Sequence, residues 1–263
     1  MRWIDCLLVM AFLITPVESV HANESFLHEG NTWSKLANEV MKSVQEKNYS
    51  KARERLTVLS QEFSKSNLVD KQLTVPAIHM LSGVIMDVER NLNQIRPNHQ
   101  KIHYSAYRMQ IAFDAVSHPH QPMWHAYYDE LKQDIEQMKR EIRAKDQKGY
   151  EQRVNQFYEH YQLIRPALMV SKSETTVQKL DSLMTWIRKK KDWKEQERGI
   201  QQWEKLMDPL FYGSEKDVLA MVYQWDEEVV LLKVMIWISG LIVSVLAYVS
   251  WRRYPHNQRK MAE

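Results

Sequence analysis

Cysteine is nearly missing from this chain, since Cys6 is the only one in 263 residues. It lies near the amino terminus, in a segment that we predict to be removed, so the mature chain would contain no thiol. A chain without thiols cannot form disulfides, thiolate metal sites or a cysteine nucleophile. A domain of roughly 205 residues needs none of these, because it is long enough to bury a substantial hydrophobic core.

Glycine is also scarce, with six residues in the whole chain. Glycine-rich phosphate-binding loops and serine nucleophile elbows are missing, and strands have almost no support in the pattern. Acidic residues fall mostly between apolar positions, where a solvated helix surface explains them. Examples are Glu39, Glu54, Glu62, Asp134 and Glu141. We therefore predict no catalytic residues, no cofactor and no enzyme activity.

Apolar residues recur instead at alternating steps of three and four, which is the pattern of packed helices. The apolar stripes of seven predicted helices occupy residues 33–44, 52–63, 78–95, 102–116, 124–142, 154–164 and 177–187. Pro76 opens the third helix, which runs until Pro97, and Pro166 closes the sixth. Ser173 caps the seventh, which could continue as far as Pro209.

Short connections favour antiparallel neighbours, so the helices should pair as hairpins that begin near Trp33, Pro76, Met123 and Glu174. Residues 46–49 and the residues after them weakly echo the segment that begins with 147–150. The expected fold is an all-α domain of helical hairpins, either a bundle or a diverged tetratricopeptide-like array. The regular stripes favour bundle packing. Further on, Ser214 and Asp217 form a predicted helix-capping pair.

A long apolar run lies near the carboxyl end, at residues 229–251, VVLLKVMIWISGLIVSVLAYVSW, with Lys233 as its one charge. At ~1.5 Å per residue this run reaches about 35 Å, enough to cross a hydrocarbon layer of roughly 30 Å. Acidic residues precede it, and a tail at 252–263 follows with Arg252, Arg253, Arg259 and Lys260. This excess of positive charge predicts a cytoplasmic tail and an extracytoplasmic domain at 23–228.

The amino terminus agrees with export. Arg2 opens a short positive region, residues 7–14 are apolar, and Val20-His21-Ala22 resembles a signal peptidase site. Residues 1–22 are thus predicted to be a signal peptide. Within the membrane run, Gly240 and Ser244 form a small-xxx-small pair that could support a weak homodimer.

Two groups of histidines are candidate metal ligands. They are His99 with His103, spaced i and i+4, and the later set His118, His120, Met123 and His125. Such spacing suits zinc or copper. However, the first pair lacks the glutamate of the His-Glu-x-x-His motif, and the second lies in a proline-containing polar turn. We predict no metal site.

A basic and aromatic segment forms part of the last predicted outer helix. It contains Trp186, Arg188, Lys189, Lys190, Lys191, Trp193, Lys194 and Arg198. Interleaving of this kind occurs in nucleic-acid-binding proteins. Acidic residues interrupt it and the domain is predicted to lie outside the cytoplasm, so we favour a solvated helix face and no nucleic-acid partner.

The layout as a whole resembles a known family. The terminal segments MRWIDCLLVMAFLITPVESVHA and VLLKVMIWISGLIVSVLAYVSWRRYPHNQRK flank a helical middle that is rich in tryptophan and tyrosine. This combination is similar to the YpjB family of sporulation proteins from Bacillus and its relatives. The resemblance implies a plasma-membrane location and an association with sporulation, and it supplies no functional residues.

These observations together predict a membrane-anchored helical protein that acts by binding another membrane or extracytoplasmic protein. Tethering both partners to one membrane would raise their effective concentration. Two alternatives remain open. One is an accessory or sensor subunit of a cell-wall or respiratory membrane complex, and the other is an outer-face hydrolase of wall material.

Overall fold

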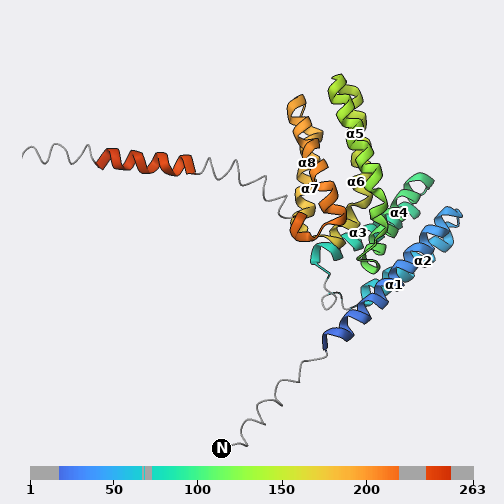
Figure 1. The fold of residues 1–263 in the computed structure, drawn as a ribbon. Helices are drawn as coiled ribbons and strands as arrows, with labels where there is room; N and C mark the ends of the chain where they lie inside the picture. The colour runs from blue at the N-terminus through green and yellow to red at the C-terminus, as the bar shows by residue number, and fades with distance from the viewer. Residues whose placement is uncertain (1–17, 67, 69–72, 219–234, 250–263) are drawn as a thin grey trace, which may run out of the picture. The chain divides into compact units, whose positions relative to one another are not determined.

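Figure 1 shows the computed structural model, which describes residues 18–66, 68, 73–218 and 235–249, with side chains from Glu29 onward. The chain forms two compact units that divide between Met207 and Asp208.

Across the described ranges the regular structure is helical without any strand, which confirms the all-α class. The elements are α1 (Glu18–Gln45), α2 (Tyr49–Lys65), α3 (Val75–Leu92), α4 (His99–Ser117), the 3-10 helix η3 (Met123–Tyr127), α5 (Tyr128–Ala144), α6 (Gln147–Ser171), α7 (Glu174–Lys189) and α8 (Trp193–Tyr212). Residues 235–249 form one more helix.

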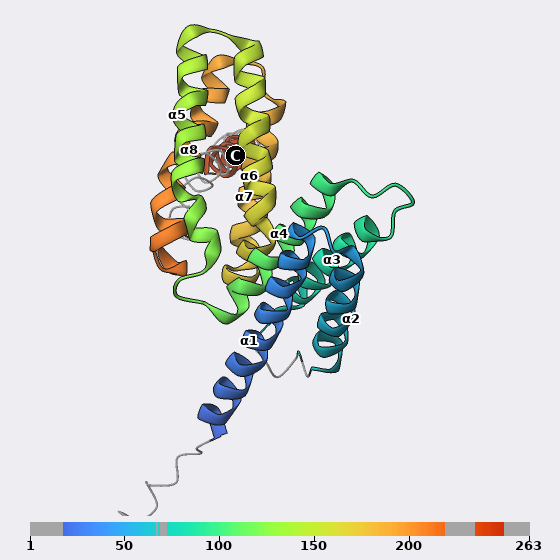
Figure 2. The ribbon, with the colours of Figure 1, turned by 90° about the vertical axis from the view of Figure 1, so that its right-hand side faces the viewer.

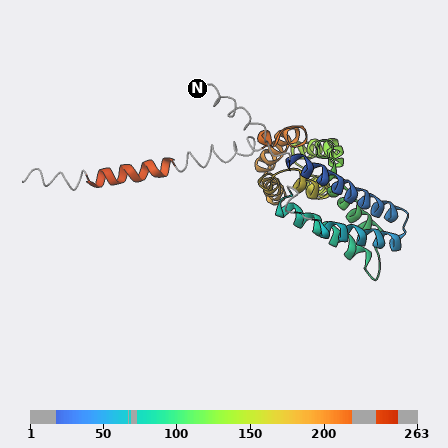
Figure 3. The ribbon, with the colours of Figure 1, turned by 90° about the horizontal axis from the view of Figure 1, so that it is seen from below.

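The first four helices share one hydrophobic core. Three rings pack edge to face in it, namely Trp33 of α1, Phe63 of α2 and Phe113 of α4. The ring centroids are 5.2 Å apart for Trp33 and Phe63, 5.7 Å for Phe63 and Phe113, and 6.4 Å for Trp33 and Phe113. This arrangement suits the quadrupoles of aromatic rings better than face-to-face stacking. The predicted apolar stripe of α2 is confirmed, since its buried residues are Ala52, Leu56, Leu59 and Phe63. Figure 3 shows α1 and α2 lying side by side.

A second core forms among α5, α6, α7 and the first part of α8 (Figure 2). Phe157 and Tyr161 of α6 pack edge to face on Trp203, at 5.0 and 5.4 Å between centroids. Arg165 of α6 donates two hydrogen bonds to the carboxylate of Asp181 in α7, at 2.7 and 2.6 Å. The Tyr161 hydroxyl donates to the same carboxylate at 2.7 Å. This forked contact fixes α7 on α6.

Two of the hairpins turn in the same way. Lys47 and Lys145 adopt the left-handed conformation, at φ of 56° and 55°, which ends the first helix of each hairpin. The next residue caps the second helix, because the side chains of Asn48 and Asp146 each accept from the backbone N–H three residues on, at 3.1 and 3.0 Å.

This shared geometry corrects the expected internal echo. Residues 46–49 match residues 144–147 in conformation, with a left-handed lysine followed by a capping side chain. The expected match to 147–150 is therefore three residues out of register. The expected echo pairs Tyr49 with Tyr150, whereas the turn depends on the left-handed lysine and the capping residue after it.

Pro166 does not close the sixth helix as predicted. Instead, α6 continues through it to Ser171. A proline inside a helix has no N–H for the carbonyl four residues earlier, here that of Gln162. Arg108 of α4 supplies the missing donor, because its Nε donates to the Gln162 carbonyl at 3.0 Å. Its Nη1 also donates to Asp87 of α3 at 3.2 Å, so one side chain joins three helices.

The predicted end of the third helix is also wrong. Helix α3 ends at Leu92, and Ile95 is fully exposed although it continues the apolar spacing. Asn93 closes the helix through its N–H to the Glu89 carbonyl at 3.0 Å. The residue before Pro97 avoids helical conformation, so the turn toward α4 begins several residues earlier.

The expected continuous helix from residue 174 to Pro209 is two helices. After α7 ends at Lys189, Asp192 caps α8 by accepting from the Glu195 N–H at 3.1 Å. Pro209 lies inside α8, which ends at Tyr212. The caps predicted from sequence at Ser173 and at Ser214 with Asp217 are confirmed by their hydrogen bonds.

The predicted terminal segments lie mostly beyond the described residues. The signal peptide at 1–22 is described only from residue 18, where α1 begins, and the tail at 252–263 is outside the description. Of the run at 229–251, residues 235–249 are described, as a helix with every side chain exposed. Among the described helices none is both long and apolar enough to cross a membrane.

The Arg108 contact can be tested through Pro166. Arg108→Met should lower the free energy of unfolding by about 1.5–3 kcal/mol, because the Gln162 carbonyl loses a charged donor. Pro166→Ala restores an N–H that can bond this carbonyl within α6. In the Pro166→Ala background the loss from Arg108→Met should therefore be smaller, as measured by chemical denaturation. Equal losses in both backgrounds would contradict this role for Arg108.

Candidate functional site

Aromatic and imidazole side chains gather where α4, η3 and α6 meet. We define the tyrosine–histidine cluster as His103, Tyr104 and Tyr107 of α4, Tyr127 of η3, and Tyr158 and His160 of α6. Residues three and four apart share one side of a helix, which places the α4 members together. On α6, Tyr158 and His160 lie between the core residues Phe157 and Tyr161 in the sequence and are partly buried, so they lie at the edge of the core rather than within it.

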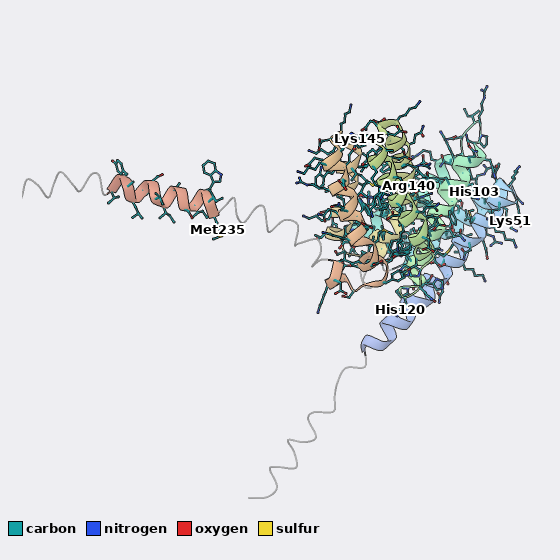
Figure 4. The ribbon with its side chains drawn as sticks, turned by 45° about the horizontal axis from the view of Figure 1, so that its top comes forward. Lys51, His103, His120, Arg140, Lys145 and Met235 are labelled. Atoms are coloured by element: carbon teal, nitrogen blue, oxygen red, sulfur yellow. The ribbon has the colours of Figure 1, made fainter. Side chains whose placement is uncertain are left out.

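The α4 side of the cluster is a row of rings. The His103 ring lies 6.4 Å from that of Tyr107 and 6.1 Å from that of His99, between centroids. His99 in turn shares a hydrogen bond of 2.9 Å with the Tyr49 hydroxyl of α2. Figure 4 labels His103 on α4. The row thus runs along α4 from the first hairpin turn toward η3.

Two phenols of the cluster, Tyr104 and Tyr127, have pKa values raised above the ordinary value. Burial raises the pKa of Tyr104 above its ordinary value, and Arg108 opposes this shift. Burial and a hydrogen bond with Tyr107 raise the pKa of Tyr127. Tyr104 is still 42% exposed. The cluster therefore offers hydroxyl groups at the edge of an apolar surface.

A partly buried hydrogen bond to a carboxylate supports His160. The Nδ1 atom of His160 lies 2.6 Å from Oδ2 of Asp134 in α5, and Asp134 is 1% exposed. This hydrogen bond raises the pKa of His160 above its ordinary value near 6.5, although burial acts in the opposite direction. The Tyr127 ring lies 6.3 Å from the His160 ring. Asp134 thus holds the imidazole in place and favours its cationic form.

Asp134 was expected on a solvated surface, and this expectation is wrong. It follows Leu131 by three residues and precedes Met138 by four, so it occupies the buried stripe of α5. The spacing alone could have identified it. A carboxylate in such a stripe requires a partner, since an unpaired buried charge is costly.

Arg188 of α7 adds a cation to the cluster. Its guanidinium lies 4.0 Å from the centroid of the Tyr158 ring, a cation–π contact. The surface therefore combines rings, hydroxyl groups and positive charge, a composition typical of the centres of protein interfaces.

In the second group of candidate metal ligands, His118 and Met123 have a structural role. His118 lies 2.7 Å from Oδ1 of Asp114, and the backbone N–H of Met123 donates to Oδ2 of the same carboxylate at 2.6 Å. This carboxylate fixes the turn between α4 and η3. Burial lowers the pKa of His125, and the charge of Lys172 adds to the shift. Within the described residues, no three His, Cys, Asp or Glu side chains gather in a way that could hold a metal ion.

The basic and aromatic segment is not on one helix as predicted. The break between α7 and α8 separates Arg188 and Lys189 from Trp193. Trp193, at the start of α8, packs on Tyr150 of α6, with ring centroids 6.1 Å apart. This segment is therefore a corner between two helices.

Comparison with known proteins places the chain in a family. The profile of the family described as "Sporulation protein YpjB (SpoYpjB)" matches residues 31–263. The chain belongs to the sporulation protein YpjB family. It is also similar to the YpjB protein of Bacillus subtilis (strain 168), with 26% identity over 195 residues that cover 73% of this chain and 71% of that protein.

The resemblance to the YpjB family seen in the sequence is therefore confirmed. No solved structure matches the chain. The match of the YpjB profile includes every member of the tyrosine–histidine cluster, since all of them lie between residues 31 and 263.

The Asp134–His160 pair predicts a pH dependence. A histidine with a raised folded pKa stabilises the fold fully below its unfolded pKa of about 6.5, and this contribution is lost as pH rises through the folded value. The destabilisation caused by His160→Gln should accordingly shrink as the pH rises above about 6.5.

The same pair can be followed by NMR titration. Asp134→Asn should lower the titration midpoint of the His160 ring, because it removes the partner charge. The matched variant Asp129→Asn, at an exposed position of α5, should leave this midpoint unchanged. A midpoint that does not respond to Asp134→Asn would contradict the assignment.

Proposed function

We propose that this protein is a single-pass plasma-membrane protein that takes part in sporulation by binding another membrane or extracytoplasmic protein, without catalysis. Membership of the sporulation protein YpjB family supports the association with sporulation. Two features of the described chain support the rest, namely the apolar helix at 235–249 and the tyrosine–histidine cluster.

The helix at 235–249 is the observation that carries the proposal. Its large apolar side chains are all exposed, Trp237 to 80%, Leu241 to 68% and Val249 to 45%. A helix that is apolar on every side suits a lipid environment, because water would leave all of that surface unburied. The sequence remains apolar on both sides, from residue 229 to residue 251. We therefore propose that 229–251 is the membrane anchor.

Charge sets the proposed orientation of this anchor. The arginines and lysine after residue 251 favour a cytoplasmic tail, and the domain at 23–228 is then extracytoplasmic. On the helix itself, the Ser244 hydroxyl donates to the Gly240 carbonyl at 2.8 Å, and apart from the neighbouring residues and backbone of its own helix nothing lies within 4 Å of a Cβ placed at Gly240. This small-residue face is open to a second helix, and a weak homodimer through it stays a prediction.

The tyrosine–histidine cluster is the proposed binding face. Tyrosine and arginine are the residue types that dominate binding energy at protein interfaces. Tyr104 and Tyr158 bring such rings to the surface, and Arg188 and the Asp134–His160 pair hold the surroundings rigid. Anchoring in the same membrane as the partner would convert a weak contact at this face into an occupied one.

Cysteine labelling tests the orientation. In a Cys6→Ser background, Lys51→Cys on the exposed side of α2 should react with a membrane-impermeant maleimide in intact protoplasts. Arg259→Cys in the tail should react only after lysis. The reverse pattern would place the domain in the cytoplasm and contradict the proposal.

Sporulation tests the binding face. Tyr104→Ala with Tyr158→Ala should weaken partner binding by about 30-fold or more for each tyrosine removed, since central interface residues cost about 2 kcal/mol or more each. The yield of heat-resistant spores should fall in a host that depends on this chain, with the protein level checked by immunoblot. Tyr212→Ala, at a tyrosine 67% exposed outside the cluster, is the control. Equal effects of both changes would exclude the cluster as the binding face.

A further inference from the structure

A separate cavity lies at the corner between α6, α7 and α8. Its volume is about 220 Å³. It is lined on α6 by Gln147, Tyr150, Glu151 and Asn155, and on the other side by Ile187, Lys190, Lys191 and Gln196, among others. Arg188, which contacts Tyr158 of the tyrosine–histidine cluster, also lines the cavity, whereas the six residues of the cluster do not. The cavity therefore requires its own explanation.

Gln196 is the most informative residue of this cavity. It is completely buried, and its Nε2 donates to the Lys190 carbonyl at 2.8 Å. That bond fixes the orientation of the amide and leaves Oε1 as the free atom, which has no hydrogen-bond partner. A buried polar atom without a partner is costly, so it requires an explanation, and at Gln196 the cavity offers one. The missing partner must be a donor, because Oε1 can only accept.

The charges around the cavity favour an anion. Arg188, Lys190 and Lys191 line it with positive charge, and Glu151 is the opposing charge among the lining residues. The Gln147 side chain donates to the Glu151 carboxylate at 3.1 Å, so one oxygen of this carboxylate already has a hydrogen-bond donor. A ligand with a protonated amine would be repelled by the lysines. The donor to Gln196 should therefore be a hydroxyl group.

The volume of the cavity limits the size of its ligand. The cavity would hold about seven waters at about 30 Å³ each, and it is smaller than pockets for drug-sized ligands, which start at about 300 Å³. Two neighbouring lysines match the two negative charges of a phosphate monoester better than the single charge of a carboxylate. We infer that this cavity binds a small polyol phosphate, with its phosphate at Lys190 and Lys191 and a hydroxyl donating to Oε1 of Gln196.

Calorimetry on the full-length protein tests this assignment with sn-glycerol 3-phosphate as the probe. Methyl phosphate is the comparison ligand, since at about pH 8 it is a dianion without a donor. Glycerol phosphate should bind about tenfold more tightly than methyl phosphate, because only it can satisfy Gln196. Equal affinities would overturn the role of Gln196.

Two charge-matched variants test the position of the phosphate. Lys190→Gln with Lys191→Gln should weaken glycerol phosphate binding about tenfold, whereas Lys189→Gln with Lys194→Gln, which removes the same charge outside the cavity, should change it within about twofold. Equal losses in the two pairs, or no binding by the unaltered protein, would overturn the proposal.

The glycerophosphate group occurs both in free form and in lipid headgroups, and vesicles distinguish the two. Binding to vesicles that contain phosphatidylglycerol, but not to phosphatidylcholine alone, with the same dependence on Lys190 and Lys191, supports a headgroup ligand. Binding of free glycerol phosphate without vesicle binding supports a soluble ligand.

Discussion

The carbonyl that Pro166 leaves without a partner is the constraint on which the arrangement of the helices depends. Arg108 binds the Gln162 carbonyl and Asp87 at once, so α4 is joined to both α6 and α3. This position also aligns the proposed binding face, because Tyr104 lies four residues before Arg108 on α4. On α6, Tyr158 lies four residues before Gln162. One charged contact therefore sets how the two helices present their tyrosines.

Much of the fold could be predicted from the spacing of apolar residues. The stripes of α2 and α4 match their buried residues, and capping residues such as Ser173 mark helix ends through local hydrogen bonds. These features depend on neighbours within about one turn, which a sequence shows directly. Membership of the family could likewise be inferred from the terminal segments and the composition of the middle.

The features that could not be predicted depend on distant partners. Pro166 ends a helix unless another side chain supplies a donor, and Arg108 comes from a helix more than fifty residues earlier. The spacing in α5 is that of a buried Asp134, but its partner, His160, lies on the next helix, and no local pattern identifies this pair. The break after Lys189 leaves Gln196 facing a cavity, and no local pattern announces an unpartnered amide.

The central claim is that the partly exposed rings of the tyrosine–histidine cluster contact a partner protein outside the membrane during sporulation. Site-specific photocrosslinking in living cells tests it most directly, with benzoylphenylalanine placed at Tyr104 or at Arg140, an exposed residue of α5 labelled in Figure 4. The account predicts one discrete adduct from position 104 in sporulating cells and none from position 140. The same adducts from both positions, or none from position 104, would contradict it.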